Sequence, residues 1–565
     1  MQRATLLAAV AIGATAVVYA LPLQPPGCGQ TAHYAATRSF AEGRPWIDPY
    51  IGETCDVVHE QGHYYAAKGP AMDFWSAPWY LLLRSAGAVP RNPNAGQPYP
   101  AAMVGVPLRA LWQIGLWAVV LPATLLLVLL RRTVERIEPG LGTAAAVTLG
   151  LGTLMLPFST MLFAHVPAAL LAFLAFALLF RREDASSLRV AAAGAAAGLA
   201  VSTDVPLAAP AVLIGLYAAA RAPRLRRLAA FAAGGLAGLV PLLAFDWWAF
   251  GSPFHLAYSG AALNPGAGGV EQAPGQSFFG LNGPSLHVGT ALLLSQRGLL
   301  VLTPVVGAGA AGIVLLWRRG LRAEAALIGA LCVVEVAWNA GRGTTEIALG
   351  GWVPGPRFLI PLLPFLCFAL APVLRRLPVT VAALALVSAG AMLVATSAEP
   401  LLSNDDTHHW VARIAEGNFT STLLSLAGVG HGWIAILPFY GFAAAAIVAA
   451  IVATPLPVRR RDVIVAVAAL AAWVAVEHGA PALLEIDRLV HQSFGAAAAI
   501  LLVAGAAWAI SRLARGDRLG AAPGLLLVVF AARRFDEHTK WALLVALLVL
   551  AGLALGRVRG RGIPA

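Results

Sequence analysis

Long apolar runs recur along almost the whole chain, and they constrain its fold more than any other feature. The clearest, such as residues 110–130 and 433–453, are long enough to cross the roughly 30 Å hydrocarbon core of a bilayer. Only 12% of the 565 residues are charged, whereas a soluble globular protein carries about 25%. The sequence therefore predicts an all-α polytopic membrane protein with about 14 to 16 transmembrane helices.

Basic residues gather in short arginine clusters that follow every second apolar run, for example at 131–136 and 318–322. Short cytoplasmic loops carry an excess of Lys and Arg, so we expect these clusters and the N-terminus to face the cytoplasm. This topology accounts for the formal net charge of +12, and we expect no nucleic-acid partner. The long polar loops are then predicted to lie outside: 22–109, 251–298, 339–357 and 397–432.

The first outer loop, residues 22–109, carries a dense set of polar side chains. Residues 30–42 and 72–86 have apolar residues at helical spacing, which predicts two amphipathic helices lying in the membrane interface. The polar residues between them are Asp48, Glu53, Asp56, His59, Glu60, His63, Tyr64, Tyr65 and Lys68.

Lys68 stands out in this loop because the chain has only one other lysine, Lys540. The Gly69-Pro70 pair after it favours a turn, and the second amphipathic helix follows at once. This arrangement places an ammonium at the height of the lipid headgroups, where a compact, strongly hydrated charge suits a lipid-linked phosphate. A solvated polar loop is the alternative interpretation.

Several motifs of this loop and of later segments resemble one family in their order and sidedness. The first loop reads HYAATRSFAEGRPWIDPY and then TCDVVHEQGHYYAAKGP, and FSTMLFAHVPAALLAF, STDVP and GGWVPGPRFLIPLLPFL follow later in the chain. Together they resemble the GT-C superfamily of integral-membrane glycosyltransferases that use polyprenyl-phosphate sugars. The resemblance covers residues 1 to 370, and it is greatest to the group of the bacterial aminoarabinose transferase and the protein O-mannosyltransferases.

The resemblance implies a site and a role for each of its residues. Asp56, in the TxD position, would be the general base on the acceptor hydroxyl, with Asp48 in WIDPY as the alternative. Lys68, Arg357 and Arg297 would bind the donor phosphate. The residues expected to contact substrate are His59, His63, Tyr64, Tyr65, His165 and Asp204. The chain departs from many relatives at Gln30-Thr31, where they carry an acidic pair.

Elementary chemistry leads to the same requirements. Inverting sugar transfer needs a base within hydrogen-bond reach of the attacking hydroxyl, and it needs the charge of the leaving phosphate to be stabilised. Lys and Arg can supply this stabilisation alone or together with a divalent cation, so no cofactor is certain and the metal ligands are unknown. The expected partners are a polyprenyl-phosphate sugar donor, membrane lipids, and an extracytoplasmic acceptor that is a glycan, a lipid or a protein.

Three divisions of the chain follow from these expectations. Residues 1–250 would form an N-terminal catalytic transmembrane module that includes the first outer loop. Residues 251–298, rich in Gly, Asn and Pro, would be an outer loop that serves either as a lid or as a plain connector. Residues 299–565 would form the C-terminal transmembrane helices. The expected location is the bacterial cytoplasmic (inner) membrane, with the active site on the extracytoplasmic face.

The sequence leaves one disulfide and two alternative functions undecided. Cys28 and Cys55 both lie in the first outer loop, and in an oxidising compartment they could form a disulfide. A flippase or other transporter of lipid-linked glycans is an alternative function, and its charged residues would lie deep in the membrane, as Glu335 does. A glycan polymerase or ligase with a diphosphate-linked donor is a second alternative, because it would share the same sidedness.

Overall fold

A computed structural model describes most of the chain. The described ranges are 2–181, 185–220, 223–255, 262–263, 283–342, 348–401, 408–454 and 459–485, with residues 505, 508, 509 and 512. Residues 1–480 form one compact unit and residues 481–565 a second. The part of the expected C-terminal helices beyond residue 485, apart from those four residues, lies outside the described residues, as do residues 256–261 and 264–282 of the expected lid at 251–298.

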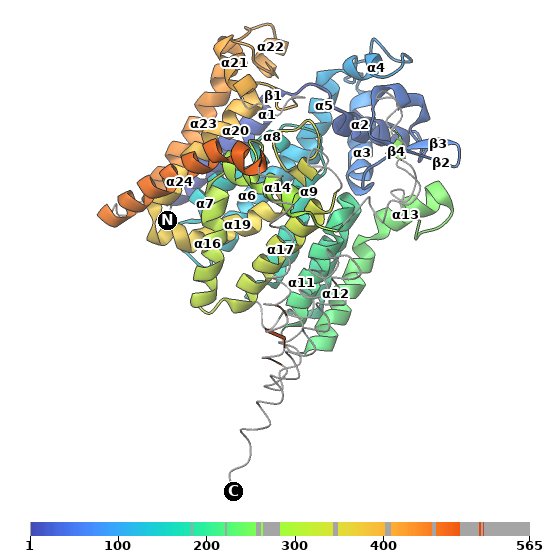
Figure 1. Ribbon diagram of the computed structural model, residues 1–565. Coiled ribbons are helices and arrows are strands. Elements are labelled where there is room, and N and C mark those ends of the chain that lie inside the picture. Colours follow the sequence, from blue (N-terminus) through green and yellow to red (C-terminus); the bar gives the residue numbers. More distant parts are fainter. Residues whose placement is uncertain are drawn as a thin grey trace. The chain divides into compact units, whose positions relative to one another are not determined.

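The first unit consists almost entirely of helices (Figure 1). In its first half these are α1 (Gln2–Ala20), α5 (Leu108–Gly115), the π-helix η2 (Leu116–Val120), α6 (Leu121–Val134), α7 (Gly142–Leu151), α8 (Met155–Ser159), α9 (His165–Leu179), α10 (Ser187–Thr203), the 3-10 helix η3 (Val205–Leu207), α11 (Ala208–Ala219), α12 (Arg224–Gly238) and α13 (Val240–Phe250). In its second half they are α14 (Leu286–Leu294), α15 (Leu299–Leu302), α16 (Val305–Arg318), α17 (Arg322–Ala340), the 3-10 helix η6 (Arg357–Leu362), α19 (Leu363–Arg376), α20 (Pro378–Ser397), α21 (His408–Ala415), α22 (Leu423–Leu426), α23 (Trp433–Ala453) and α24 (Arg460–Glu485).

Many of these helices have the length and composition of membrane spans. Among the described residues five helical segments pass this test, and seven do if each of two bent pairs is one span. The bent pairs are α12 with α13, and α14–α15 with α16. Shorter apolar helices accompany them. The prediction of an all-α polytopic membrane protein is confirmed.

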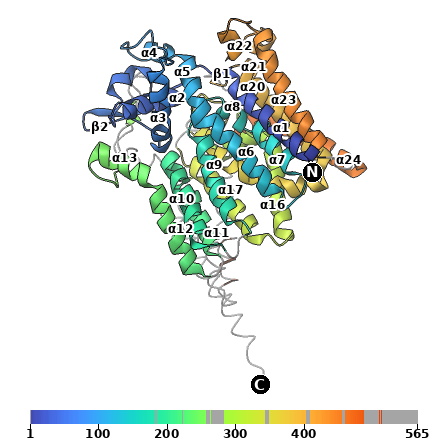
Figure 2. The same ribbon diagram turned by 180° about the vertical axis from the view of Figure 1, so that it is seen from behind.

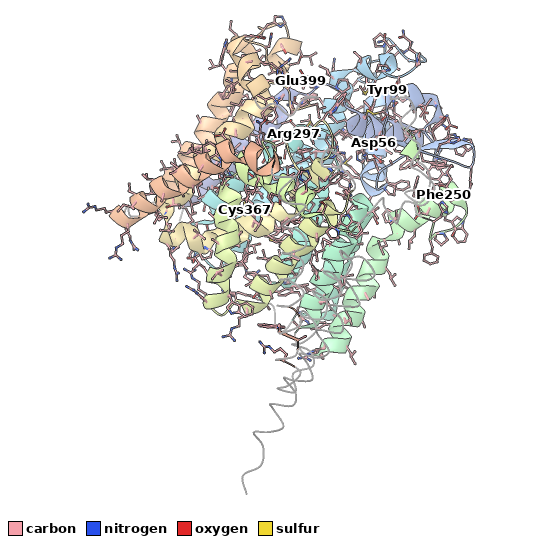
Figure 3. All side chains as sticks on the ribbon, in the orientation of Figure 1. Asp56, Tyr99, Phe250, Arg297, Cys367 and Glu399 are labelled. Carbon is pink, nitrogen blue, oxygen red and sulfur yellow. A yellow bond between two sulfur atoms is a disulfide. The ribbon has the colours of Figure 1, made fainter. Side chains whose placement is uncertain are left out.

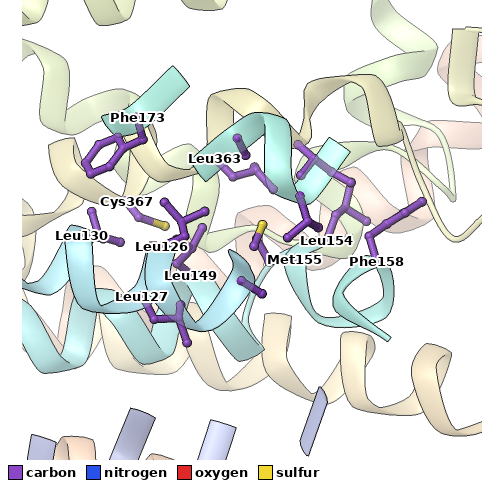
Figure 4. Close-up of a cluster of buried hydrophobic side chains, with 14 of the residues drawn as sticks. Leu126, Leu127, Leu130, Leu149, Leu154, Met155, Phe158, Phe173, Leu363 and Cys367 are labelled. Atoms are coloured by element: carbon purple, nitrogen blue, oxygen red, sulfur yellow. The ribbon is translucent and has the colours of Figure 1, made fainter. Parts of the chain in front are cut away.

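The buried core lies between helices that are distant in the sequence. Figure 4 shows leucines of α6 and α7, Met155 and Phe158 of α8, and Phe173 of α9 packed against Leu363 and Cys367 of α19. Cys367 therefore serves as a small buried hydrophobic residue, as its apolar surroundings in the sequence predict. The helix α1 packs along α23 in the same bundle.

Small residues allow α10 and α12 to approach each other closely (Figure 2). A Cβ on Gly194 would lie 2.0 Å from the carbonyl oxygen of Phe231, and one on Gly234 would lie 1.8 Å from that of Ala191. Glycines four residues apart on both helices repeat this contact, as in the small-xxx-small interfaces of membrane helices. The contact fixes α10, whose C-terminal end at Thr203 borders the site described below.

The arginine-rich loops meet at one end of the bundle. Glu138, after α6, accepts a hydrogen bond of 3.0 Å from Arg375 at the end of α19 and pairs with Arg319 after α16. Arg136 donates to the carbonyl of Phe180 at the end of α9, at 2.6 Å. Because α9 and α19 end here, their first residues lie at the opposite end, where α10 also ends.

The first outer loop folds at that opposite end. Its elements are α2 (Cys28–Ala41), the 3-10 helix η1 (Asp48–Glu53), β2 (Val57–Glu60), β3 (His63–Ala66), α3 (Ala71–Ser85) and α4 (Ala101–Val104). Both predicted amphipathic helices are present, with ends within two residues of the expected ones. However, α2 is buried along most of its length against α3 and the hairpin, so it does not offer one face to lipid as an interfacial helix would.

Short strands complete the loop and tie it to distant segments. The strands β2 and β3 pair antiparallel across Gln61 and Gly62, which both have positive φ, 50° and 81°, as a two-residue type I′ turn requires. The strand β4 (Ala262–Leu263) pairs with the outer edge of β2. Elsewhere β1 (Pro22–Leu23) pairs with β5 (Ser421–Thr422). None of these strands was predicted from the sequence.

Candidate active site

The β2–β3 hairpin brings Asp56 and Lys68 into contact. Val57 pairs with Ala66, so Asp56 and Lys68 leave the same end of the hairpin. The Lys68 N–H then donates to the carbonyl of Ala66 at 2.8 Å, which turns the chain back toward Asp56. The Lys68 ammonium forms an ion pair with the Asp56 carboxylate, and the side chains are 16% and 27% exposed. Both groups are therefore held in place and stay partly exposed. Figure 3 labels Asp56 among the side chains of the chain.

Two contacts with the start of α2 fix the backbone at Asp56. Cys28 and Cys55 form a disulfide, with Cα atoms 5.2 Å apart, the pairing that the sequence left open. The Thr54 hydroxyl donates to the carbonyl of Cys28 at 2.8 Å and accepts the Asp56 N–H at 3.2 Å. The threonine of the TxD motif therefore positions the aspartate two residues later.

The turn after Lys68 rests on the C-terminal end of α10. A Cβ on Gly69 would lie 2.5 Å from the carbonyl oxygen of Thr203 and 2.7 Å from that of Ser202. Only glycine permits this approach without displacement of the turn. The contact brings Lys68 within electrostatic reach of Asp204, the next residue after α10.

Asp204 and His165 form a second polar pair beside Lys68. His165 Nδ1 lies 2.6 Å from Asp204 Oδ2, and both side chains are largely buried. The imidazole stacks on Phe163, with ring centroids 6.1 Å apart, and meets the ring of Phe358 edge-on at 5.3 Å. Asp204 therefore orients the imidazole, and the two phenylalanine rings enclose it.

Arg357 approaches the same group of residues from the start of η6. Its guanidinium lies 5.1 Å from the ring centre of Phe163 and 5.0 Å from that of Phe358. Its charge acts on both Asp56 and His165. Arg297 donates to the carbonyls of Gly351 and Val353 at 2.9 and 3.2 Å. It therefore braces the segment that leads into Arg357.

Three charged or polar side chains of this cluster were not predicted from the sequence. His33 of α2 and Asp73 of α3 form a buried pair at 2.9 Å, directly behind the segments that carry Asp56 and Lys68. Arg342 lies 3.8 Å from the ring centre of Phe358 and acts electrostatically on Asp204. The available signal was an ionisable residue, Asp73, within a mostly apolar helix predicted for the membrane interface.

Burial and neighbouring charges shift the pKa values of these groups. Burial alone would raise the pKa of Asp56, but the charges of Lys68 and Arg357 outweigh it and hold the value below the usual range. Burial and the charge of Arg357 lower the pKa of Lys68 in spite of Asp56. Burial raises the pKa of Asp73, whereas His165 outweighs burial and lowers that of Asp204. Asp56 is therefore an anion at neutral pH, within reach of several cations.

Asp48 lies at the other end of the hairpin. Its carboxylate contacts His63 Nδ1 at 2.6 Å and accepts the N–H of Tyr64 at 2.7 Å. Tyr64 pairs with His59, which lies three residues beyond Asp56 along β2. Asp48, which binds Tyr64, is therefore separated from Asp56 by about 10 Å of strand. The structure therefore does not bring Asp48 to Lys68.

The other predicted substrate contacts lie along the hairpin itself. The rings of His59 and Tyr64 lie 4.6 Å apart. Tyr65 is buried, and its hydroxyl donates to the carbonyl of Ala249 at 3.4 Å. Among the residues that the structure describes, no three His, Cys, Asp or Glu side chains gather as a set of metal ligands.

The fold defines a polytopic helical membrane protein. Its charged cluster places an anionic candidate for a base, Asp56, beside several cations. This cluster lies at the end of the bundle opposite the arginine-rich loops.

No protein-family model matches the chain, and no curated protein matches it. Two solved structures are similar to it, both of ArnT from Cupriavidus metallidurans.

The similarity to both structures is distant. The apo structure is 17% identical with a TM-score of 0.45, over 84% of this chain and 76% of that chain. The structure bound to undecaprenyl phosphate is 14% identical with a TM-score of 0.44, over 80% of this chain and 76% of that chain.

Proposed function

We propose that this protein is a glycosyltransferase that moves a sugar from a polyprenyl-phosphate donor to an acceptor outside the cytoplasmic membrane. The observation that carries the proposal is the contact between the Asp56 carboxylate and the Lys68 ammonium, with Arg357 within electrostatic reach of both. Asp56 is the general base on the acceptor hydroxyl. Lys68 and Arg357 hold the donor phosphate.

The ion pair of Asp56 and Lys68 sets the order of the steps in the proposed reaction: donor binding comes before removal of the acceptor proton. The donor's phosphodiester anion competes with Asp56 for Lys68 and Arg357, so its binding removes the charges that hold the pKa of Asp56 down. Asp56 becomes a stronger base at the moment when the acceptor hydroxyl must lose its proton. The acceptor oxygen then bonds to the anomeric carbon, the bond from that carbon to the phosphate oxygen breaks, and the electron pair leaves with the phosphate. Lys68 and Arg357 stabilise the added negative charge.

The remaining residues have supporting roles in this proposal. His165 and Asp204, next to Lys68, contact the donor, and Arg297 acts by holding the segment before Arg357. The hairpin residues His59, His63 and Tyr64 line the approach of the acceptor, and the buried Tyr65 supports the hairpin from below. Asp48 remains the alternative base, but its contacts with His63 and Tyr64 favour a structural role.

Sidedness follows from the ends of the bundle. The loops around Glu138, Arg319 and Arg375 meet at one end, and the positive-inside rule assigns that end to the cytoplasm. The site then faces outward, where polyprenyl-linked sugars are available and nucleotide sugars are not. This placement also supports a lipid-linked donor.

Complementation of a null strain tests the proposal. Asp56→Asn keeps the side-chain shape and removes the base, so we expect transfer to fall by about a hundred- to ten-thousandfold. The strain should then accumulate polyprenyl-phosphate sugar, which mass spectrometry of its lipids would identify. Asp48→Asn is the matched control and should complement. Full activity of Asp56→Asn would refute the assignment, and accumulation of a diphosphate-linked glycan would favour a polymerase or ligase.

A further inference from the structure

A second pair of ionisable side chains is buried behind Asp56 and Lys68, and the proposed reaction does not use it. His33 of α2 and Asp73 of α3 are each only 1% exposed, and His33 Nδ1 lies 2.9 Å from Asp73 Oδ1. Thr37, one turn after His33, donates its hydroxyl to the same oxygen at 3.5 Å. Ionisable groups buried together beside a reactive centre are candidates for a functional role.

The start of α2 brings His33 to the region of Asp56. The disulfide from Cys28 ties the first residue of α2 to the residue before Asp56, and His33 lies about 7.5 Å further along this helix. His33 acts electrostatically on Asp56, and Lys68 acts in the same way on Asp73. The buried pair is therefore coupled to both members of the ion pair.

The contact with Asp73 determines which nitrogen of His33 can take up a further proton. A nitrogen and an oxygen 2.9 Å apart form a hydrogen bond with one proton between them. Nδ1 is thereby engaged, and Nε2 is the nitrogen that remains. The carboxylate stabilises the imidazolium that forms when Nε2 is protonated. Burial raises the pKa of Asp73, so the pair binds this second proton more readily than an exposed pair would.

Asp56 needs a proton acceptor on its buried side while both substrates are bound. Its side chain is 27% exposed, and in the proposed reaction the acceptor hydroxyl occupies that open side. Substrates that fill a site exclude water, so the proton cannot leave to solvent by the route through which the hydroxyl entered. His33 lies on the buried side, where α2 packs against α3 (Figure 1).

We propose that His33, oriented by Asp73, takes the acceptor's proton from Asp56 in each turnover, directly or through one water molecule; this rests on the proposed function. The O–H bond of the Asp56 carboxyl group breaks, and an N–H bond forms at His33 Nε2. Asp56 returns to its carboxylate form, and the Asp73 carboxylate balances the charge on the imidazolium. When the products leave and water returns, the proton leaves through Asp56. His33 and Asp73 thus act through Asp56 and not on the substrates.

Replacement of both groups by amides tests this relay in the full chain in nanodiscs. His33→Gln with Asp73→Asn keeps polar side chains of similar size, carries no proton and leaves no unpaired buried charge. Lipid extract of the null strain supplies the donor, and membranes of that strain supply the acceptor. We expect kcat to fall by about a hundredfold, whereas binding of a long-chain polyprenyl monophosphate and the KM for donor stay unchanged.

A solvent isotope effect reports on the proton itself. Loss of the proton from Asp56 becomes the slow step in the double variant, so deuterium oxide should slow this variant more than it slows the wild type. The single variants His33→Gln and Asp73→Asn should each lose as much as the double variant, because the two groups act as a unit. His431→Gln is the matched control, because His431 is an exposed histidine of another outer loop; it should keep full kcat. A thermal melt of each variant verifies folding.

Each result bears on the relay separately from the proposed function. An unchanged kcat in the double variant, an isotope effect equal to that of the wild type, or additive losses in the single variants would overturn the relay. Loss of polyprenyl monophosphate binding in step with kcat would overturn it too, since the pair would then only hold Lys68 in place. Asp56→Asn tests the proposed function by itself: full transfer in that variant would refute the base, whatever the double variant does.

Discussion

Replacement of Gly69 by alanine should damage the site without touching any group that reacts. The added methyl would meet two main-chain oxygens at the end of α10, those of Thr203 and Ser202, at 2.5 and 2.7 Å. Neither oxygen can rotate aside as a side chain would, because each belongs to the helix backbone. The Lys68 turn must therefore withdraw from α10 for Gly69→Ala to fold.

The size of the effect follows from these distances. Ordinary van der Waals contact begins at 3.4 Å, so the turn must move by about 1 Å. Overpacking of this kind costs about 1–3 kcal/mol of stability, which the chain can absorb. A misplacement of about 1 Å at a site that relies on positioning costs about a hundredfold in rate. We therefore expect Gly69→Ala to lose most of its transfer activity while it remains folded.

Sugar transfer and polyprenyl-phosphate binding, measured beside a thermal melt, would show this separation. Gly115→Ala is the matched control, since a Cβ at Gly115 meets nothing within 4 Å and its φ is already helical. It should be neutral or slightly stabilising. Wild-type binding and turnover in Gly69→Ala would show that the close approach of the turn to α10 does not position Lys68.

Two further changes have defined outcomes. Lys68→Met should raise the pKa of Asp56 toward the usual carboxyl range, because the depressed value depends on the Lys68 ammonium. Infrared spectra of the carboxyl group, recorded over a range of pH, would measure this rise. An unchanged titration would contradict the prediction. By the same sign, the ionised Asp56 carboxylate contributes stability at neutral pH, and this contribution is lost as pH falls through its depressed pKa. Joint replacement of Cys28 and Cys55 by serine removes a cross-link between residues 27 apart in the sequence. It should lower the free energy of unfolding by about 3–4 kcal/mol. A melting temperature that neither the double variant nor a reductant lowers would contradict this.

Local composition and periodicity were sufficient for much of the molecule. Hydropathy depends on the residues within one segment, so the membrane-spanning helices and both helices of the first outer loop could be predicted. Asp56 and Lys68, to which we assign roles in the proposed reaction, could be singled out because of the TxD motif and because the chain has only two lysines. The disulfide between Cys28 and Cys55 needed only the expectation that both lie in one outer loop.

Contacts between distant segments could not be predicted from local composition and periodicity. The sequence offered Asp48 and Asp56 as near equals, and only the hairpin register places one beside Lys68 and the other at the far end. The buried pair of His33 and Asp73 requires two helices to pack face to face, which no local pattern records.

The sequence by itself therefore determined the membrane class of this protein, the approximate positions of its helices and the loop that carries its charges, because each depends on neighbours along the chain. Tertiary structure alone decided which charges meet: His165 with Asp204, and Arg357 with the ion pair of Asp56. The physical reason is that an ion pair depends on separation in space, and separation along the chain says little about it once helices fold back across a membrane.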